Sequence, residues 1–309
     1  MQEFDAIIVG AGPAGLTAGI YLARARQRVL IVDQSIVGGQ VILTHAVANY
    51  PGLPETSGYQ LVSTMRKQAE QFGCTILSNA PVTGFNFKGN VKHLTTKGED
   101  YQAKVAIVAV GGDPRTLGLE SEARLRGKGI SYCATCDGDF FTDQEIVVVG
   151  GGNSALEEAV SLTTYASKVT IIHQFDHFQA YAHAIDEARS NPKIHSVMES
   201  KVEEFIGDES LSAVRIKSGK DGTVSTIPAT GAFIFIGYMP KTKPFADCVA
   251  LTPAGEIVVD DGMASSVPGV FAAGDARKKR YRQITTAVSD GTIAALSAME
   301  YMAVWKKED

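Results

Sequence analysis

Short, uninterrupted apolar runs, each followed by a glycine-rich turn, set the pattern of this chain. Residues 6–9 form an apolar run of strand length, residues 10–15 a turn with three glycines, and residues 16–25 a stretch with helical spacing. A second apolar run, residues 29–32, ends in Asp33. Unbroken apolar runs are typical of buried strands in parallel sheets. The order therefore predicts a strand–helix–strand unit of the kind that binds dinucleotides.

Each glycine of this turn has a physical role in such a unit. Gly10 permits the tight turn, Gly12 lets the backbone approach a pyrophosphate, and Gly15 lets helix and strand pack closely. The start of the helix presents free N–H groups and the positive end of its dipole to phosphates. Asp33 is placed to accept hydrogen bonds from ribose hydroxyls. We therefore predict a bound nucleotide at this turn.

The same pattern returns in the middle of the chain. Residues 145–149 are a predicted strand, residues 150–155 read Gly-Gly-Gly-Asn-Ser-Ala, residues 156–165 have helical spacing, and residues 168–172 are the second predicted strand. Gly150, Gly152 and Ala155 occupy the three positions of the fingerprint. The repeat predicts a second nucleotide-binding unit.

The remaining segments predict how the two units are joined. We expect a helix at 61–72, an antiparallel meander at 74–108, a further meander after the second unit's strands, and a closing helix at about 284–303. Too few residues remain at the end of the chain for a third nucleotide core. The fold class is therefore α/β, with two Rossmann-like domains of the three-layer ββα type, the second inserted into the first. The first domain would comprise residues 1–112 and 241–309, and the inserted domain residues 113–240.

Composition and charge exclude several functional classes. The chain has 309 residues, 45% of them hydrophobic and 20% charged, which is ordinary for a globular protein of two domains. Its net charge of −5 gives no electrostatic case for binding nucleic acid. No apolar run reaches the ~18 residues of a membrane span. The N-terminus lacks the basic region of a signal peptide, so a cytoplasmic location is the default expectation.

The candidate chemistry lies in a pair of cysteines between the two glycine turns. Cys133 and Cys136 form a Cys-x-x-Cys motif with Asp137 directly behind it. A dithiol can store two electrons as a disulfide, and no second cysteine or histidine pair completes a zinc site. A partly buried Asp137 could act as general acid to a leaving thiolate, and the alternative is an acid that only caps a helix or turn.

The motifs together resemble one family, the low-molecular-weight thioredoxin reductases, which are FAD-dependent pyridine nucleotide-disulfide oxidoreductases. The likeness covers the whole chain. It is carried by GAGPAG at 10–15, GGQ at 38–40 with NYPG at 49–52, CATCDG at 133–138, GGGNSA at 150–155, VFAAGD at 270–275 and YRQ at 281–283.

The resemblance implies cofactor sites in both domains. In the FAD site, the ADP half would be held by Gly10, Gly12, Gly15 and Asp33. The flavin end would be approached by Gly39, Gln40 and Asn49. The ribityl and pyrophosphate region would be bound by Asp275, and the ring would lie near Arg282 and Gln283. The nicotinamide nucleotide would lie at Gly150, Gly152, Asn153, Ala155 and Gln174.

The resemblance also implies a route for electrons. They would pass from the reduced donor through FAD to the Cys133–Cys136 disulfide and on to thioredoxin, with Cys136 nearer the flavin and Cys133 attacking the substrate. The inserted domain would rotate about the two crossings between domains, and the protein would be a homodimer.

One stretch departs from the family. Members that use NADPH carry HRRDxFRA after the second strand of the inserted domain, and this chain reads His-Gln-Phe-Asp-His-Phe-Gln-Ala at 173–180. Gln174, Phe175 and Gln179 replace the arginines that hold the 2′-phosphate, with a loss of ~1.5–3 kcal/mol for each contact. This favours NADH over NADPH. The alternatives are ferredoxin or a second flavin as donor, or a non-enzymatic redox sensor.

The basic run at 277–280 also has two interpretations. It could dock an acidic partner such as thioredoxin or ferredoxin, or it could be a solvated surface turn. The tail around Trp305 also has two interpretations: it could cover a flavin, or it could simply end a helix.

Overall fold

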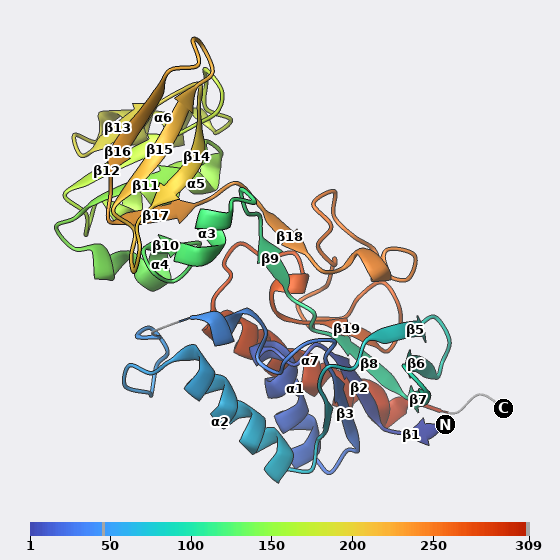
Figure 1. The fold of residues 1–309 in the computed structure, drawn as a ribbon. Helices are drawn as coiled ribbons and strands as arrows, with labels where there is room; N and C mark the ends of the chain where they lie inside the picture. Colours follow the sequence, from blue (N-terminus) through green and yellow to red (C-terminus); the bar gives the residue numbers. More distant parts are fainter. Residues whose placement is uncertain (45–46, 307–309) are drawn as a thin grey trace. The chain divides into compact units, whose positions relative to one another are not determined.

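The computed structural model describes residues 1–44 and 47–306 and divides into two compact units. The first comprises Met1–Asp113 and Met239–Asp309, and the second Pro114–Tyr238. Figure 1 shows that each unit has its own sheet and its own helices. A short two-stranded sheet, formed by β9 (Gly112–Pro114) and β18 (Tyr238–Pro240), lies where the chain crosses between the units.

The first unit is built on a parallel sheet with the order β19-β8-β2-β3-β4. Its strands are β2 (Ala6–Val9), β3 (Val29–Val32), β4 (Thr75–Leu77), β8 (Val105–Val108) and β19 (Val270–Ala272). Its helices are α1 (Pro13–Arg24), α2 (Gly58–Gln71) and α7 (Ile284–Val304). A second sheet, ordered β1-β7-β6-β5, contains β1 (Gln2–Glu3), β5 (Val82–Asn86), β6 (Lys92–Thr96) and β7 (Glu99–Ala103).

Side chains on opposite faces of the parallel sheet enter two separate cores. Ile8 packs with apolar residues of α1, α2 and α7. Ile7, its neighbour on the strand, packs with residues of β6 and β7 on the other face. Successive side chains on a strand point to opposite faces, and both faces here are covered, which explains why β2 reads as a continuous apolar run. The unit therefore has three layers.

The second unit repeats this plan with a parallel sheet ordered β10-β17-β11-β12-β13. Its strands are β10 (Ile130–Ser131), β11 (Glu145–Val149), β12 (Lys168–Ile172), β13 (Ile194–Val197) and β17 (Gly231–Ile234). Its helices are α3 (Glu120–Leu125), α4 (Ala134–Asp137), α5 (Asn153–Leu162) and α6 (Ala182–Ser190). An antiparallel sheet contains β14 (Ser200–Ile206), β15 (Ala213–Ser218) and β16 (Val224–Pro228).

The second unit also has two cores, one on each face of its parallel sheet. Val148 packs with residues of α5 and α6, and Val147 packs with residues of β14 and β15. The predicted α/β class with two Rossmann-like units is thus confirmed.

Two local predictions are wrong. The segment 74–108 is not one meander, because β4 and β8, at its two ends, join the parallel sheet. The stretch after β12 is not a meander throughout, because it first forms α6 and β13. Among the described residues, no helix combines the length and apolar character that crossing a membrane requires.

Candidate active site

The first glycine turn is shaped by contacts that leave no room for side chains at two positions. A Cβ on Gly10, whose φ is +109°, would lie 2.3 Å from the carbonyl oxygen of Ala109, and one on Gly15 would lie 1.9 Å from that of Gly10. A Cβ on Gly12 would meet no atom within 4 Å. Gly12 is also the N-cap of α1, so the N-cap residue of this helix supplies no side-chain cap. The turn therefore offers open space and helix N–H groups, which suit a phosphate group.

Asp33 closes the same turn from the end of β3. Its Oδ2 accepts the backbone N–H of Ala11 at 2.7 Å, and its Oδ1 accepts the N–H of Ser35 at 2.8 Å. The carboxylate thus holds two backbone segments in place. Its expected contact with ribose stays a prediction.

Asp275 follows β19 and has a buried carboxylate oxygen. Among the residues that the structure describes, no donor bonds its Oδ1, and the Lys279 ammonium is 3.9 Å away. Burial raises the pKa of this carboxyl; the charges of Lys279 and Arg282 oppose the rise, and Asp290 adds to it. A buried acceptor without a donor is costly unless a ligand supplies one. The hydroxyls of a ribityl chain are donors of this kind.

Asp290 on α7 organises the loop that carries Asp275, and sequence reasoning missed it. Its carboxylate accepts two hydrogen bonds from the Arg277 guanidinium, at 2.6 and 2.9 Å, one from Lys279 at 2.7 Å, and one from the Gly274 N–H at 3.1 Å. Asp290 and Lys279 are each 4% exposed at the side chain. The available signal was an acid on a helical stretch at a position where the neighbouring residues Gly291, Ala294 and Ala295 are small and buried.

This arrangement changes both interpretations for two of the four basic residues, whereas Lys278 and Arg280 are exposed. Arg277 and Lys279 are turned inward onto Asp290, with side chains 20% and 4% exposed. Two of the four cations therefore stabilise the interior rather than forming part of a solvated turn or a docking surface.

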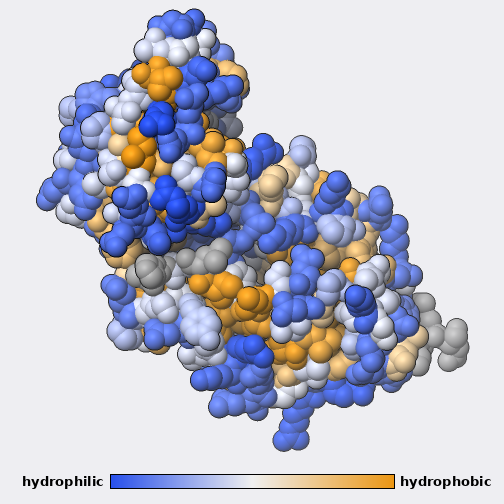
Figure 2. Space-filling model, in the orientation of Figure 1, coloured by the Kyte–Doolittle hydropathy of each residue, from blue (hydrophilic) through white to orange (hydrophobic). Residues whose placement is uncertain are grey.

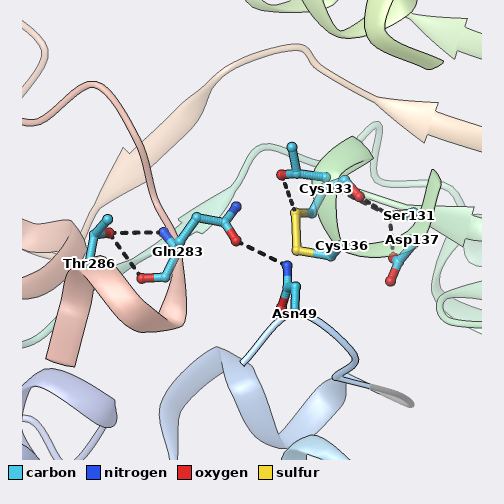
Figure 3. Close-up of a disulfide and its surroundings, with 8 residues drawn as sticks. Asn49, Ser131, Cys133, Cys136, Asp137, Gln283 and Thr286 are labelled. Atoms are coloured by element: carbon cyan, nitrogen blue, oxygen red, sulfur yellow. Dashed lines mark hydrogen bonds between the residues drawn. A yellow bond between two sulfur atoms is a disulfide. The ribbon is translucent and has the colours of Figure 1, made fainter. Parts of the chain in front are cut away.

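Residues predicted near the flavin end lie in the first unit, and two of them contact each other. The Asn49 amide donates to Gln283 Oε1 at 3.3 Å, as Figure 3 shows. The Gln40 amide donates to Asp113, and Arg282 pairs with Glu256. Gly39, next to Gln40, has a φ of +60°. Gln283 also begins α7 through reciprocal hydrogen bonds with Thr286. The structure thus brings Asn49 and Gln283 together, although they are far apart in the sequence.

The two cysteines of the motif form a disulfide in the second unit, at the start of α4. The Asp137 carboxylate accepts a hydrogen bond from the Ser131 hydroxyl at 2.5 Å, shown in Figure 3. Burial raises the pKa of Asp137, the hydrogen bond from Ser131 lowers it, and the charge of Asp139 raises it further. An acid with a raised pKa beside a redox disulfide suits proton transfer to sulfur.

The remaining cysteines are single thiols. Cys74 is buried, and burial raises its pKa to about 12. Cys248 is partly buried, with a pKa that burial also raises. In the part of the chain that the structure describes, no cluster of three or more His, Cys, Asp or Glu side chains could hold a metal ion.

The second glycine turn repeats the first and is also closely packed, because a Cβ on Gly151 would lie 2.3 Å from the His173 ring. A Cβ on Gly150, whose φ is +143°, would lie 2.3 Å from the carbonyl oxygen of Phe235, whereas one on Gly152 would come no closer than 3.8 Å to any atom. The third position is the buried Ala155. Asn153 accepts the N–H of Tyr181 at 2.7 Å, so its side chain holds the neighbouring loop.

The end of β12 has an aromatic cluster where NADPH-using relatives are expected to have arginines. The His173 ring stacks on Phe178 at 5.8 Å, and burial lowers its pKa, which favours the neutral form. Gln174 is exposed. Nearby, Lys220 pairs with Glu199 at 2.7 Å and also interacts with the charge of Asp176. The end of β12 therefore presents little positive charge to a 2′-phosphate.

These features define a class: residues 4–291 match the pyridine nucleotide-disulphide oxidoreductase family, and the chain belongs to it. The chain is 42% identical over 306 residues to the thioredoxin reductase of Peptoclostridium acidaminophilum, covering 97% of each sequence. It is 39% identical to the 34.2 kDa protein in the rubredoxin operon of Clostridium pasteurianum, covering 97% of this chain and 98% of that protein. The crystal structure of thioredoxin reductase from Streptococcus pyogenes has a TM-score of 0.93 and 40% identity, covering 97% of this chain and 98% of the other.

Proposed function

We propose that this chain is a flavoenzyme that reduces thioredoxin, taking electrons from a reduced donor through FAD and the Cys133–Cys136 disulfide. The observation that carries the proposal is the disulfide with the partly buried Asp137 carboxyl directly behind it. Full-length likeness to thioredoxin reductases supports the same activity. FAD and a nicotinamide nucleotide are the cofactors of the family to which the chain belongs.

The residues of the first unit fit FAD. Gly12 leaves open space at the start of α1 for a pyrophosphate, and Asp275 has an enclosed oxygen that can accept from a hydroxyl. FAD, when bound, supplies a two-electron carrier between the donor and the disulfide. Asp33, Asn49 and Gln283 are the further residues that we assign to this site.

The sulfur chemistry balances with two electrons and two protons. Reduction breaks the S–S bond, and the Cys133 thiolate then attacks the thioredoxin disulfide to form a mixed disulfide. One thioredoxin sulfur leaves and takes a proton. Cys136 attacks the Cys133 sulfur, which re-forms the enzyme disulfide and releases the second thioredoxin thiol. We assign Asp137 as the group that delivers protons to the leaving sulfurs, since its pKa is raised by burial.

We infer that the donor is NADH rather than NADPH. The open turn at Gly152 suits a dinucleotide phosphate, and the exposed Gln174 can hydrogen-bond ribose hydroxyls. The charge around Asp176 and the Lys220–Glu199 pair opposes a 2′-phosphate, which carries about two negative charges.

Reduced ferredoxin or a second flavin is the second candidate donor. The observation in its favour is the side chains at the three positions where NADPH-using relatives have arginine: Gln174, Phe175 and Gln179. Ferredoxin would deliver electrons directly and would need no nucleotide contact at the end of β12.

A homodimer in the cytoplasm is the expected form. Figure 2 shows apolar side chains gathered over α7 of the first unit. On this helix Leu296 is exposed, and Ile293 and Met299 are partly buried. Burial of this surface against a second copy would remove the apolar residues from water.

An anaerobic titration tests the proposed function. We expect a yellow protein whose flavin band is bleached by NADH more readily than by NADPH, and which then reduces thioredoxin. Cys133→Ser or Cys136→Ser should abolish thioredoxin reduction and leave flavin bleaching intact, and the control Cys248→Ser should leave both unchanged.

Each other outcome of the titration would indicate a different donor or a different function. Bleaching only by reduced ferredoxin would replace the donor. Bleaching without thioredoxin turnover would indicate a redox sensor. A colourless protein that FAD does not reconstitute would refute the proposal.

A further inference from the structure

The hydroxyl of Ser131 connects the cysteine turn to the carboxyl group of Asp137. Ser131 Oγ donates to Asp137 Oδ2 at 2.5 Å and accepts the backbone N–H of Cys133 at 3.1 Å. The Cys133 carbonyl oxygen is farther away, at 3.3 Å, so the single hydroxyl proton goes to the closer carboxylate. Ser131 is buried, so water competes little for either contact. Figure 3 shows the two side chains turned toward each other beside the disulfide.

We propose that Ser131 is a positioning residue that holds the Asp137 carboxylate at a fixed place beside the redox disulfide and sets the pH at which it takes up a proton. The inference rests on the proposed role of Asp137 in delivering protons. Ser131 itself touches neither sulfur nor substrate in this assignment. It acts through Asp137.

The groups around Asp137 explain why one hydroxyl matters. Burial and the charge of Asp139 both favour the protonated carboxyl, and the Ser131 hydrogen bond favours the ionised form. Helix α5, which packs against α4, carries the neighbouring acids Glu157 and Glu158, and the Tyr165 ring lies close to Gly138. The two motif cysteines are the other titratable groups of this turn once they are reduced. The Ser131 hydroxyl is thus the contact that opposes burial by favouring the ionised carboxylate.

The neighbouring residue supplies a matched control. Tyr132 donates to Glu122 Oε1 at 2.7 Å, and the Arg126 guanidinium lies 4.9 Å from the centre of its ring. Glu122 is buried and also accepts N–H groups at the start of α3. Tyr132→Phe therefore removes a buried side-chain hydrogen bond from the same segment without touching Asp137.

The experiment measures the protonation of Asp137 directly, in the oxidised full-length protein with its cofactor. Carboxyl carbons of aspartate are labelled with ¹³C, and the Asp137 signal is identified as the one that Asp137→Asn removes. We expect Ser131→Ala to move the titration midpoint upward by about one pH unit, because a hydrogen bond to a charged group is lost. Ser131→Thr, which keeps the hydroxyl, should restore the wild-type midpoint, and Tyr132→Phe should leave it unchanged.

An unchanged or lowered midpoint in Ser131→Ala would overturn the proposal, as would an equal shift in Tyr132→Phe. If Ser131→Ala does not fold, the pair Ser131→Thr and Ser131→Val makes the same comparison between side chains of equal size, with and without a hydroxyl. The pH profile of thioredoxin reduction should move in the same direction as the midpoint. Absence of any thioredoxin reduction would refute the proposed function while the midpoint still decides the role of Ser131.

Discussion

The two glycine turns of this protein have similar backbones but different surroundings. At the third fingerprint position the first turn has Gly15 against the carbonyl of Gly10, and the second has Ala155, which needs more room. In the first turn, the Asp33 carboxylate accepts a hydrogen bond from the Ala11 N–H. In the second unit, β12 is followed by His173, whose ring stacks on Phe178. The first unit adds the buried ionic cluster around Asp290, and the exposed Gln174 follows the second unit's strand.

The difference indicates two kinds of ligand. A turn that is packed tightly, bonded by a carboxylate and supported by buried charges suits a cofactor that stays bound. A turn whose neighbouring strand is followed by an exposed polar residue, here Gln174, suits a donor that must arrive and leave in each cycle. Shared topology therefore does not imply shared binding behaviour, and the residues around each turn decide it.

The largest expected effect comes from removing the ionic cluster of the first unit. Asp290→Asn would leave Arg277 and Lys279 buried without their carboxylate, and breaking a buried pair in this way costs about 3–5 kcal/mol. Hydrogen exchange followed by mass spectrometry should show faster exchange in α1 and α7, with β11 and β12 of the second unit unaffected. The control Glu70→Gln removes an exposed pair with Arg66 and should change little. Equal loosening of both units would contradict this account.

Next in size is the effect of adding one methyl group to the first turn. Gly15→Ala places a Cβ 1.9 Å from a backbone oxygen, so we expect a loss of about 1–3 kcal/mol in stability together with loss of FAD. Gly12→Ala meets no atom and should fold normally, yet bind FAD more weakly by crowding the pyrophosphate. Melting temperature and flavin content of the purified proteins separate the two. The distinction fails if Gly12→Ala lowers the melting temperature of the apo-protein as far as Gly15→Ala does.

A smaller change should alter donor choice at the second turn. The double variant Gln174→Arg with Phe175→Arg introduces two guanidinium groups beside the 2′-position, each worth ~1.5–3 kcal/mol to a bound phosphate. We expect kcat/KM with NADPH to rise about tenfold or more, with little change for NADH. Gln174→Glu is the charge-reversed control and should lower NADPH use further. No gain with NADPH would place the donor elsewhere.

The smallest effect concerns the enclosed carboxyl of Asp275. Because burial raises its pKa, the native apo-protein binds this proton more readily than the unfolded chain, and the associated stability is lost as pH rises from about 4 through the raised pKa. Asp275→Asn should therefore stabilise the apo-protein at pH 7 by about 1 kcal/mol, with a smaller gain at pH 4. Its affinity for FAD should fall. Thermal unfolding of both apo-proteins at the two pH values checks this, and equal gains at both would count against it.

The sequence predicted the elements whose signal is local. Strands β2 and β3 are buried throughout and appear as unbroken apolar runs, and β11 and β12 are mainly apolar and buried after their first residues. Edge strand β13 has partly buried ends and an exposed middle, and α6 buries only Ala184 and Ala188, so neither produced a clear pattern.

The candidate site divides in the same way. The cysteine motif and both glycine turns are contiguous in the chain and could be found by spacing alone. The contacts Ser131–Asp137, Asn49–Gln283 and Lys279–Asp290 depend on where side chains point after folding, which no spacing rule reveals. The inward direction of Arg277 and Lys279 was missed for this reason.

The four cysteines allow the oxidation state of the protein to be measured by counting its reactive thiols. Cys74 is buried, and burial raises its pKa to about 12. A thiol-reactive dye added to the native, oxidised protein can therefore reach only the partly buried Cys248. Opening the Cys133–Cys136 bond adds two more reactive sulfurs. The number of dye-reactive thiols per chain should therefore rise from one to three on reduction. This number would report, without any substrate or partner, the extent to which each preparation has been reduced.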